Sequence, residues 1–327
     1  MVYIIMVEIK EYCGWKYMHN KETAQYFIDP NEKKECPQTF FKYYSLSKNS
    51  VEALTNAYIY VSHPSQLNDP FDCNKNMIKI STNDSIKALW EHLYSELVEK
   101  FDNDLEAMLH YSQEAFMNVL YVKMGIVSLT TTNRNMLMWS HYANHNGFCV
   151  EWDINKFGFN YHGPFPIHYT NEIKSFDIEE YGGPLSMLIQ SNVKSKVWDY
   201  ENEWRLLALP PKFRDFIFVG SDAEEFKYPD NHNRKLAYSL SAVKSVTLGG
   251  RFFHDNIYKI SDREYEIVYN SKFDLDYQII DFLSNPKLSY IDIYRVTDKN
   301  LSDIETCKVT IYKINEYKFR MFLLTSL

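Results

Sequence analysis

The chain has 327 residues, of which 45% are apolar, so it is long enough to bury a sizeable core without disulfides or metal ions. Its net charge of -8 disfavours unspecific binding to nucleic acid, because neutralising phosphates requires a clustered excess of Lys and Arg; a local basic groove remains compatible with it. The five cysteines show no CxxC or CxxH spacing, and no apolar run is as long as a membrane span. We therefore expect a cytoplasmic protein that has no membrane partner.

The chain is predicted to contain one main domain and two shorter ends. The apolar stretch 2–7 is too short for a signal peptide and is interpreted as a strand. The polar stretch 29–37 contains two prolines that break regular structure, so residues 1–38 are predicted to form an N-terminal extension. Residues 39–296 would then form the main domain, and residues 297–327 a C-terminal extension packed on it.

The main domain begins with a predicted strand, helix and strand. An aromatic-rich run predicts the first strand over residues 40–46. Val51 and Leu54 stand at helical spacing and predict a helix over residues 47–56. A second strand is predicted over residues 57–62.

The clearest helical pattern lies over residues 84–98, where apolar residues form one stripe behind Asp84, a residue type that caps helices. The pattern continues over residues 105–120, which predicts a second helix packed nearby. We interpret both as core helices.

The second half of the domain is predicted to be rich in strands. Residues 125–129 form a strand candidate, and residues 136–146 a short helix that Gly147 ends. Strands and helices alternate without a strict βαβ rhythm, which predicts an α+β fold with a mixed, partly antiparallel sheet and flanking helices. Further strands are predicted over residues 148–153, 167–170, 203–209, 243–248, 265–269 and 289–294.

The first polar cluster is the run Asn68-Asp69-Pro70-Phe71-Asp72. Asn and Asp before a proline form side-chain-capped turns, so a structural loop is one interpretation. The alternative is that the two carboxylates, three residues apart, hold a substrate hydroxyl or a metal ion.

The second cluster contains His141 and His145, which would share one helical face as the paired histidines of a zinc helix do. The metalloprotease pattern needs Glu directly after the first His, and Tyr142 stands there instead. We therefore favour a hydrogen-bonding role for His141 beside Trp139, and predict no metal site.

The third cluster is the segment from Trp198 to Arg205. In an extended strand Glu201, Glu203 and Arg205 would point to one side, and aromatic residues to the other. The structural interpretation is an ion pair on a half-solvated sheet. The functional one is a shielded carboxylate that stabilises a developing positive charge. The Gly249-Gly250 pair lacks the residues of a phosphate loop and predicts a turn.

Five motifs in the chain have a characteristic order and spacing. They are Lys42-Tyr43-Tyr44-Ser45-Leu46, Pro64 with Asn68-Asp69-Pro70-Phe71-Asp72, Met138-Trp139-Ser140-His141-Tyr142-Ala143 with His145 and Gly147, Tyr200-Glu201 with Glu203-Trp204-Arg205, and Leu248-Gly249-Gly250-Arg251. Together they resemble the bacterial domain-of-unknown-function family 2971 over about residues 40–296. This resemblance implies domain limits and site positions, but no reaction.

A second resemblance is to ADP-ribosyltransferases, whose sites combine an aromatic or polar anchor on an early strand with a glutamate on a late strand. It implies that NAD is the substrate and that a carboxylate stabilises the positive charge that develops on the ribose. The site residues that it implies are Glu203 and His141 as catalytic groups, and Tyr43, Tyr44, Asn68, Asp69, Tyr142 and Arg205 in binding.

Three functional hypotheses follow. The first is an NAD-consuming ADP-ribosyltransferase-like enzyme, an effector in stress or phage defence, which takes a protein or another acceptor. The second is a metal-dependent nuclease or other hydrolase. The third is a non-catalytic module that binds a small-molecule ligand or a protein, and it predicts fully paired carboxylates and no cavity near Glu203. The ligands of the hydrolase would be Asp69, Asp72, His141, His145 and Glu203.

Overall fold

The computed structural model describes residues 7–31, 34–79, 104, 107, 125–208, 234–297 and 303–324. The predicted helices over 84–98 and 105–120, apart from Ala107, lie outside the described residues, as does most of the predicted strand 2–7. In the described part of the chain, none of the helices is long and apolar enough to cross a membrane.

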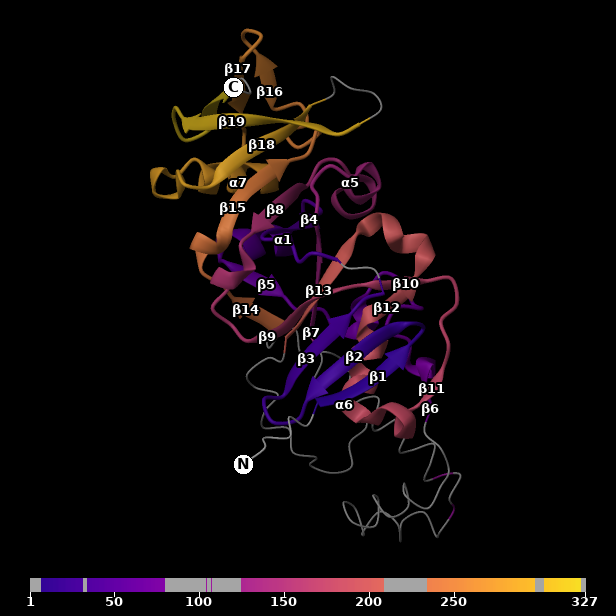
Figure 1. Cartoon of the computed structure of the whole chain (residues 1–327). Coiled ribbons are helices and arrows are strands. Elements are labelled where there is room, and N and C mark those ends of the chain that lie inside the picture. Colours follow the sequence, from indigo (N-terminus) through magenta and orange to yellow (C-terminus); the bar gives the residue numbers. More distant parts are fainter. Residues whose placement is uncertain are drawn as a thin grey trace.

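An eleven-stranded sheet runs through the molecule, with the strand order β16-β17-β20-β19-β18-β15-β8-β4-β7-β13-β9 (Figure 1). Strands β15 and β18 pair in parallel, and the other neighbours in this sheet pair antiparallel. The predicted α+β fold with a mixed sheet is therefore confirmed. The strands are β4 (Phe40–Tyr44), β7 (Gly125–Thr130), β8 (Phe148–Trp152), β9 (Tyr161–Pro166), β13 (Glu203–Ala208), β15 (Val243–Leu248), β16 (Ile257–Lys259), β17 (Glu264–Val268), β18 (Asp292–Thr297), β19 (Glu305–Lys313) and β20 (Lys318–Leu323).

Shorter elements connect and flank this sheet. The small strand pairs are β5 (Tyr58–Tyr60) with β14 (Lys235–Ala237), β6 (Ile78–Lys79) with β11 (Phe176–Asp177), and β10 (His168–Thr170) with β12 (Val193–Ser195). The α-helices are α1 (Lys48–Thr55), α5 (Met136–Ala143), α6 (Ile178–Asn192) and α7 (Leu275–Leu283). The short 3-10 helices are η1 (Pro64–Gln66), η2 (Lys75–Met77), η3 (Ile154–Lys156), η4 (Lys196–Glu201), η7 (Leu240–Ala242) and η8 (Pro286–Leu288).

Helix α5 is shorter than the sequence pattern predicts. It ends at Ala143, because Asn144 adopts a left-handed conformation with φ 49°. The expectation that Gly147 ends the helix is therefore wrong, and so is the prediction that His141 and His145 share a helical face. Gly147 instead allows close packing, since a Cβ there would lie 1.9 Å from the carbonyl oxygen of Tyr44.

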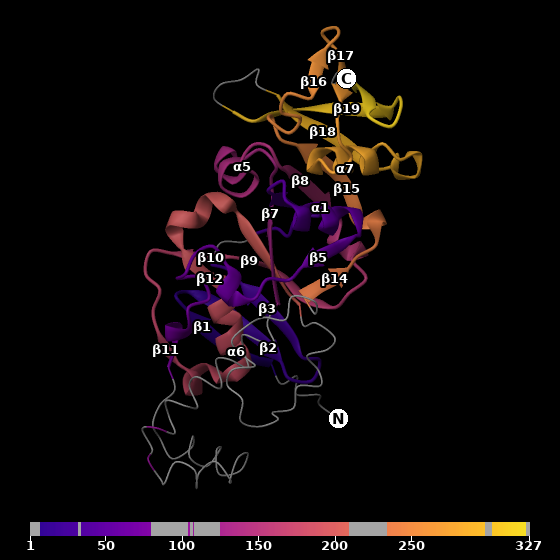
Figure 2. The same cartoon turned by 180° about the vertical axis from the view of Figure 1, so that it is seen from behind.

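The N-terminal residues form a separate three-stranded antiparallel sheet, β1 (Val7–Tyr12), β2 (Trp15–Asn20) and β3 (Gln25–Asp29). Its aromatic side chains Tyr12, Trp15 and Tyr17 share a buried cluster with Leu185 and Leu188 of α6. Figures 1 and 2 show this sheet beside α6, at the end of the molecule away from the C-terminal strands. Burial of these aromatics attaches the N-terminal sheet to the main body.

The C-terminal strands are internal members of the large sheet. Strands β19 and β20 lie between β18 and β17, and their residues Val309, Ile311 and Phe319 belong to the main hydrophobic core. The segment predicted as a C-terminal extension thus shares both the sheet and the core of the main domain.

Candidate functional site

The site lies where strands β4 and β7 diverge. Strand β4 pairs with β8 from Phe40 to Tyr44, but it pairs with β7 at one position, Phe41 with Thr130. Residues of both strands line a cavity of about 300 Å³ at this place. Its walls are formed by Phe41, Lys42, Tyr43, Ser62, Gln66, Leu67, Asn68, Asp72, Ser128, Leu129, Thr130, Met138, Tyr142, Lys194, Glu201 and Glu203.

Strand β13 presents charged residues to this side of the sheet and apolar residues to the other. Glu203 pairs with Thr130 and Arg205 with Ser128, whereas Trp204 and Leu206 belong to the main core. The predicted division into a charged and an apolar face is confirmed for residues 203–206. The expectation that Glu201 lies on the same extended strand is wrong, because Glu201 ends the 3-10 helix η4 and Asn202 adopts a left-handed conformation before β13 begins. The interpretation of a half-solvated sheet is wrong, because Glu203 is 4% and Arg205 1% exposed.

Arg205 binds two carboxylates at once. Its Nη1 and Nη2 donate to Oδ1 and Oδ2 of Asp72, at 2.9 and 2.5 Å. Its Nε and Nη2 donate to Oε1 and Oε2 of Glu203, at 2.7 and 3.1 Å. A guanidinium group has this fork geometry and a lysine does not, so the pattern requires Arg.

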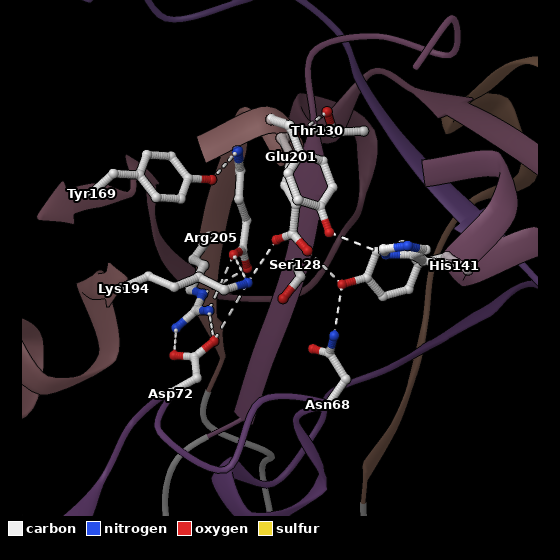
Figure 3. A network of polar contacts seen from close by, with 12 residues as sticks. Asn68, Asp72, Ser128, Thr130, His141, Tyr169, Lys194, Glu201 and Arg205 are labelled. Atoms are coloured by element: carbon white, nitrogen blue, oxygen red, sulfur yellow. Dashed lines mark hydrogen bonds and ion pairs between the residues drawn. The ribbon is translucent and has the colours of Figure 1, made fainter. Parts of the chain in front are cut away.

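Lys194, from β12, lies among three carboxylates, as Figure 3 shows. Its Nζ is 2.6 Å from Oε2 of Glu201, 3.0 Å from Oε2 of Glu203 and 3.6 Å from Oδ2 of Asp72. The ammonium group thus takes the central position that a divalent cation would need. Within the described ranges, no group of three His, Cys, Asp or Glu side chains is arranged to hold a metal ion.

The two glutamates differ in their proton affinity. Burial alone would raise the pKa of Glu203, but the charges of Arg205 and Lys194 outweigh it and hold this pKa well below its usual range. Burial raises the pKa of Glu201, and Lys194 offsets this only in part. Glu203 therefore stays ionised, while Glu201 can take up a proton.

Glu201 ends a chain of hydrogen bonds that reaches the loop before β6. Tyr142 Oη donates to Glu201 Oε1 at 2.5 Å, and Asn68 Nδ2 donates to Tyr142 Oη at 2.8 Å. Thr130 Oγ1 donates to the backbone oxygen of Glu201 at 2.6 Å. Burial, and after it the charge of Glu201, raises the pKa of Tyr142, so this hydroxyl remains a donor.

The other predicted site residues have different surroundings. Tyr43 lines the cavity and donates through Oη to the backbone oxygen of Thr132. Tyr44 packs against the rings of Phe148 and Trp152. His141 is exposed, with Nδ1 3.1 Å from Tyr200 Oη, and Asp69 accepts from the backbone N–H of Phe71. Of the predicted set, Asn68, Tyr142, Glu203 and Arg205 therefore meet in one hydrogen-bonded network, while Tyr43 contributes to the wall.

Sequence reasoning missed the two lysines of the site, Lys42 and Lys194. Lys42 begins one of the five motifs but has no predicted role in the site, and Lys194 lies in none of them. The available signal was charge balance, because buried carboxylates such as Glu201 and Glu203 need more cationic partners than Arg205 alone supplies.

Comparison with known proteins identifies one family. A search of curated proteins and a search of solved structures both find no match to the chain. The resemblance to ADP-ribosyltransferases has no support from these comparisons. The segment 138–206, which supplies Tyr142, Lys194, Glu201, Glu203 and Arg205 to the site, matches the model of the family described as "Protein of unknown function (DUF2971)", so the predicted resemblance to this family is confirmed over that segment.

Proposed function

We propose that the cavity binds the nicotinamide ribose part of NAD and that the protein cleaves the bond between nicotinamide and ribose, with Glu201 as the reactive carboxylate. One observation carries this proposal. Glu201 lines the cavity and has hydrogen-bond acceptor sites that none of the described residues fills, whereas the acceptor sites of Glu203 are filled. The predicted catalytic role is therefore assigned to Glu201, two residues before Glu203.

A count of lone pairs supports this choice. A carboxylate has about four acceptor sites. Glu203 accepts from Arg205 twice, from Lys194 once and from the side chain of Ser128. Within the described ranges Glu201 accepts once on each oxygen, from Tyr142 and from Lys194, so about two sites remain there for a ribose hydroxyl or a water molecule.

The proposed reaction is a hydrolysis in which water is the second reactant. The bond between ribose C1′ and the nicotinamide nitrogen breaks, both electrons go to that nitrogen, and positive charge develops on the ribose. The negative charge of Glu201 stabilises this transition state. Water then adds to C1′ and releases a proton, which Glu201 accepts, since burial raises its pKa and makes it a better base than an ordinary glutamate.

The size of the cavity limits what it holds. A volume of about 300 Å³ lies at the lower end of the range for ligand sites, roughly 300–1,000 Å³. It is suited to a nucleoside-sized group. The adenosine half of NAD would therefore extend beyond the walls that the described residues form.

The test is release of nicotinamide from NAD, followed by chromatography, in the wild type, Glu201→Gln and Glu203→Gln. Glu172→Gln is the matched control, because the side chain of Glu172 is 75% exposed. We expect release by the wild type and the control, and loss of about 100-fold or more in Glu201→Gln. Intact NAD with the wild type would contradict the proposal.

The same reaction suggests a cellular role. An enzyme that consumes NAD depletes the cell in which it is active, which is the basis for proposing an effector in stress or phage defence. Induced expression of the wild type should then slow growth and lower cellular NAD, and Glu201→Gln should do neither.

A second candidate is a non-catalytic module that binds a small ligand in the same cavity, although Glu203 lines this cavity and the sequence led us to expect none there for such a module. The observation that favours it is the complete pairing of Asp72, Glu203 and Arg205 inside the structure. Calorimetry with nicotinamide riboside distinguishes the two. Binding to the wild type without nicotinamide release would favour the module, and binding with release would favour the enzyme.

A further inference from the structure

Lys42 is a cation of the cavity wall without a carboxylate partner among the described residues. Its Nζ donates to the backbone oxygen of Ser128 at 3.1 Å and lies 5.9 Å from the centre of the Tyr44 ring. An ammonium group has three N–H donors. In the described part of the chain one of them is used, so two remain for a ligand.

The diverging strands explain why this ammonium lies at the cavity. Beyond the single pair of Phe41 and Thr130, β4 and β7 no longer pair, and Lys42 bridges them by binding the Ser128 carbonyl. This contact holds the end of a long, flexible side chain in one place. The side chain of Lys42 therefore loses its conformational entropy when the protein folds, before any ligand binds.

The carboxylates near Lys42 have closer cationic partners than Lys42. Asp72, Glu203 and Glu201 form ion pairs with Arg205 and Lys194, which balance two of their three negative charges, so Lys42 faces one net negative charge but contacts no carboxylate in the described part of the chain. Burial lowers the pKa of Lys42, although the more distant charges of Glu203 and Glu201 oppose this. An anionic group in contact with Lys42 would stabilise its charged form and restore the interaction that burial removes.

We infer that Lys42 binds the phosphate of a nucleotide ligand. The inference rests on the proposed function and adds to it the part of the ligand that sets specificity. Lys42 lines the cavity from β4, and Glu201 lines it from η4. A nicotinamide ribose 5′-phosphate group would therefore place its phosphate at Lys42 and its ribose near Glu201.

The experiment compares nicotinamide mononucleotide with nicotinamide riboside, which differ by this phosphate. Binding is measured by calorimetry in a Glu201→Gln background, where turnover does not interfere, with and without Lys42→Met. Lys42→Arg tests whether a cation suffices, and Lys174→Met is the control for net charge, because this exposed lysine is absent from the cavity wall. We expect the mononucleotide to bind at least about tenfold more tightly than the riboside. Lys42→Met should abolish this preference, so that the two probes bind with equal affinity.

Two results would overturn the inference whether or not the wild type releases nicotinamide. They are equal affinity for the two probes, and a preference that persists in Lys42→Met. If neither probe binds, the proposed function fails, and thermal unfolding with inorganic pyrophosphate decides the inference. Stabilisation of the wild type, at matched ionic strength, that is lost in Lys42→Met would support a phosphate site. Equal shifts, or no shift, in both proteins would refute it.

Discussion

Lys194 and Glu201 form a short ion pair within the buried network, with Nζ 2.6 Å from Oε2. Both side chains are almost fully buried, at 3% and 4% exposure. A pair removed from water in this way gives little net stability by itself, but loss of one partner leaves an uncompensated buried charge. Loss of Lys194 would also remove a cationic partner from Glu203 and Asp72, because Lys194 contacts both.

The first prediction concerns this lysine. Lys194→Met should lower the free energy of unfolding by about 3–5 kcal/mol, because three buried carboxylates would then share one cation, Arg205. Lys174→Met should change it by no more than about 0.5 kcal/mol, because that lysine is exposed. Urea unfolding measures both. Similar losses in the two variants would contradict a special role for Lys194.

The second prediction concerns pH and two buried histidines. Burial lowers the pKa of His63 to about 4 and that of His168 to about 4, with Arg234 and Lys34 contributing respectively. In the unfolded chain, both histidine side chains have the ordinary pKa of about 6.5. Between pH 6.5 and 4 the unfolded state therefore binds more protons than the folded state, and stability falls as pH falls through this range.

The size of this loss of stability follows from the shift in the pKa of each histidine. Each histidine should contribute a loss on the order of 3 kcal/mol by pH 4. Urea unfolding at a series of pH values should show a shallower dependence in the double variant His63→Gln and His168→Gln than in the wild type. The slopes are compared, because the substitutions also change packing against Trp15. Parallel slopes would show that these groups do not control acid sensitivity.

The third prediction concerns the hydroxyl of Tyr142. This group donates to Glu201 Oε1 and thereby lowers the pKa of that carboxyl, against burial, which raises it. Tyr142→Phe should therefore move the acidic limb of the pH–rate profile for nicotinamide release to higher pH. Tyr200→Phe is the matched control, since its hydroxyl bonds His141. An unchanged limb in Tyr142→Phe would argue against Glu201 as the titrating group.

The fourth prediction concerns close packing at Gly147. A methyl group there would overlap the carbonyl oxygen of Tyr44, so Gly147→Ala should destabilise the fold by about 3 kcal/mol or more. At Gly250 the nearest atom to an added Cβ is Val296 Cγ1 at 3.7 Å, an ordinary contact. Gly250→Ala should therefore have little effect. Thermal unfolding of the two variants checks the contrast, and equal stability would contradict it.

Local patterns predicted much of the sheet. The strand predicted over 243–248 is β15 as observed, and the helix predicted over 47–56 is α1, which Ser47 caps. These elements are specified by side chains that lie close together in sequence. Strands β19 and β20 went unassigned, because their place between β18 and β17 depends on pairing with distant partners.

In the candidate site, too, some features depend on residues close together in the sequence and others on residues far apart in it. The sequence by itself determined that Glu203 and Arg205 share one face of a strand and that Trp204 lies on the other, since the alternation of side chains is a property of every extended strand. Only the tertiary structure decided that Lys194 neutralises the carboxylates and that Glu201, not Glu203, retains acceptor sites at the cavity. The physical reason is that charge pairing and desolvation depend on distances between groups in space, and folding sets these distances among residues of α5, β4, β12 and β13.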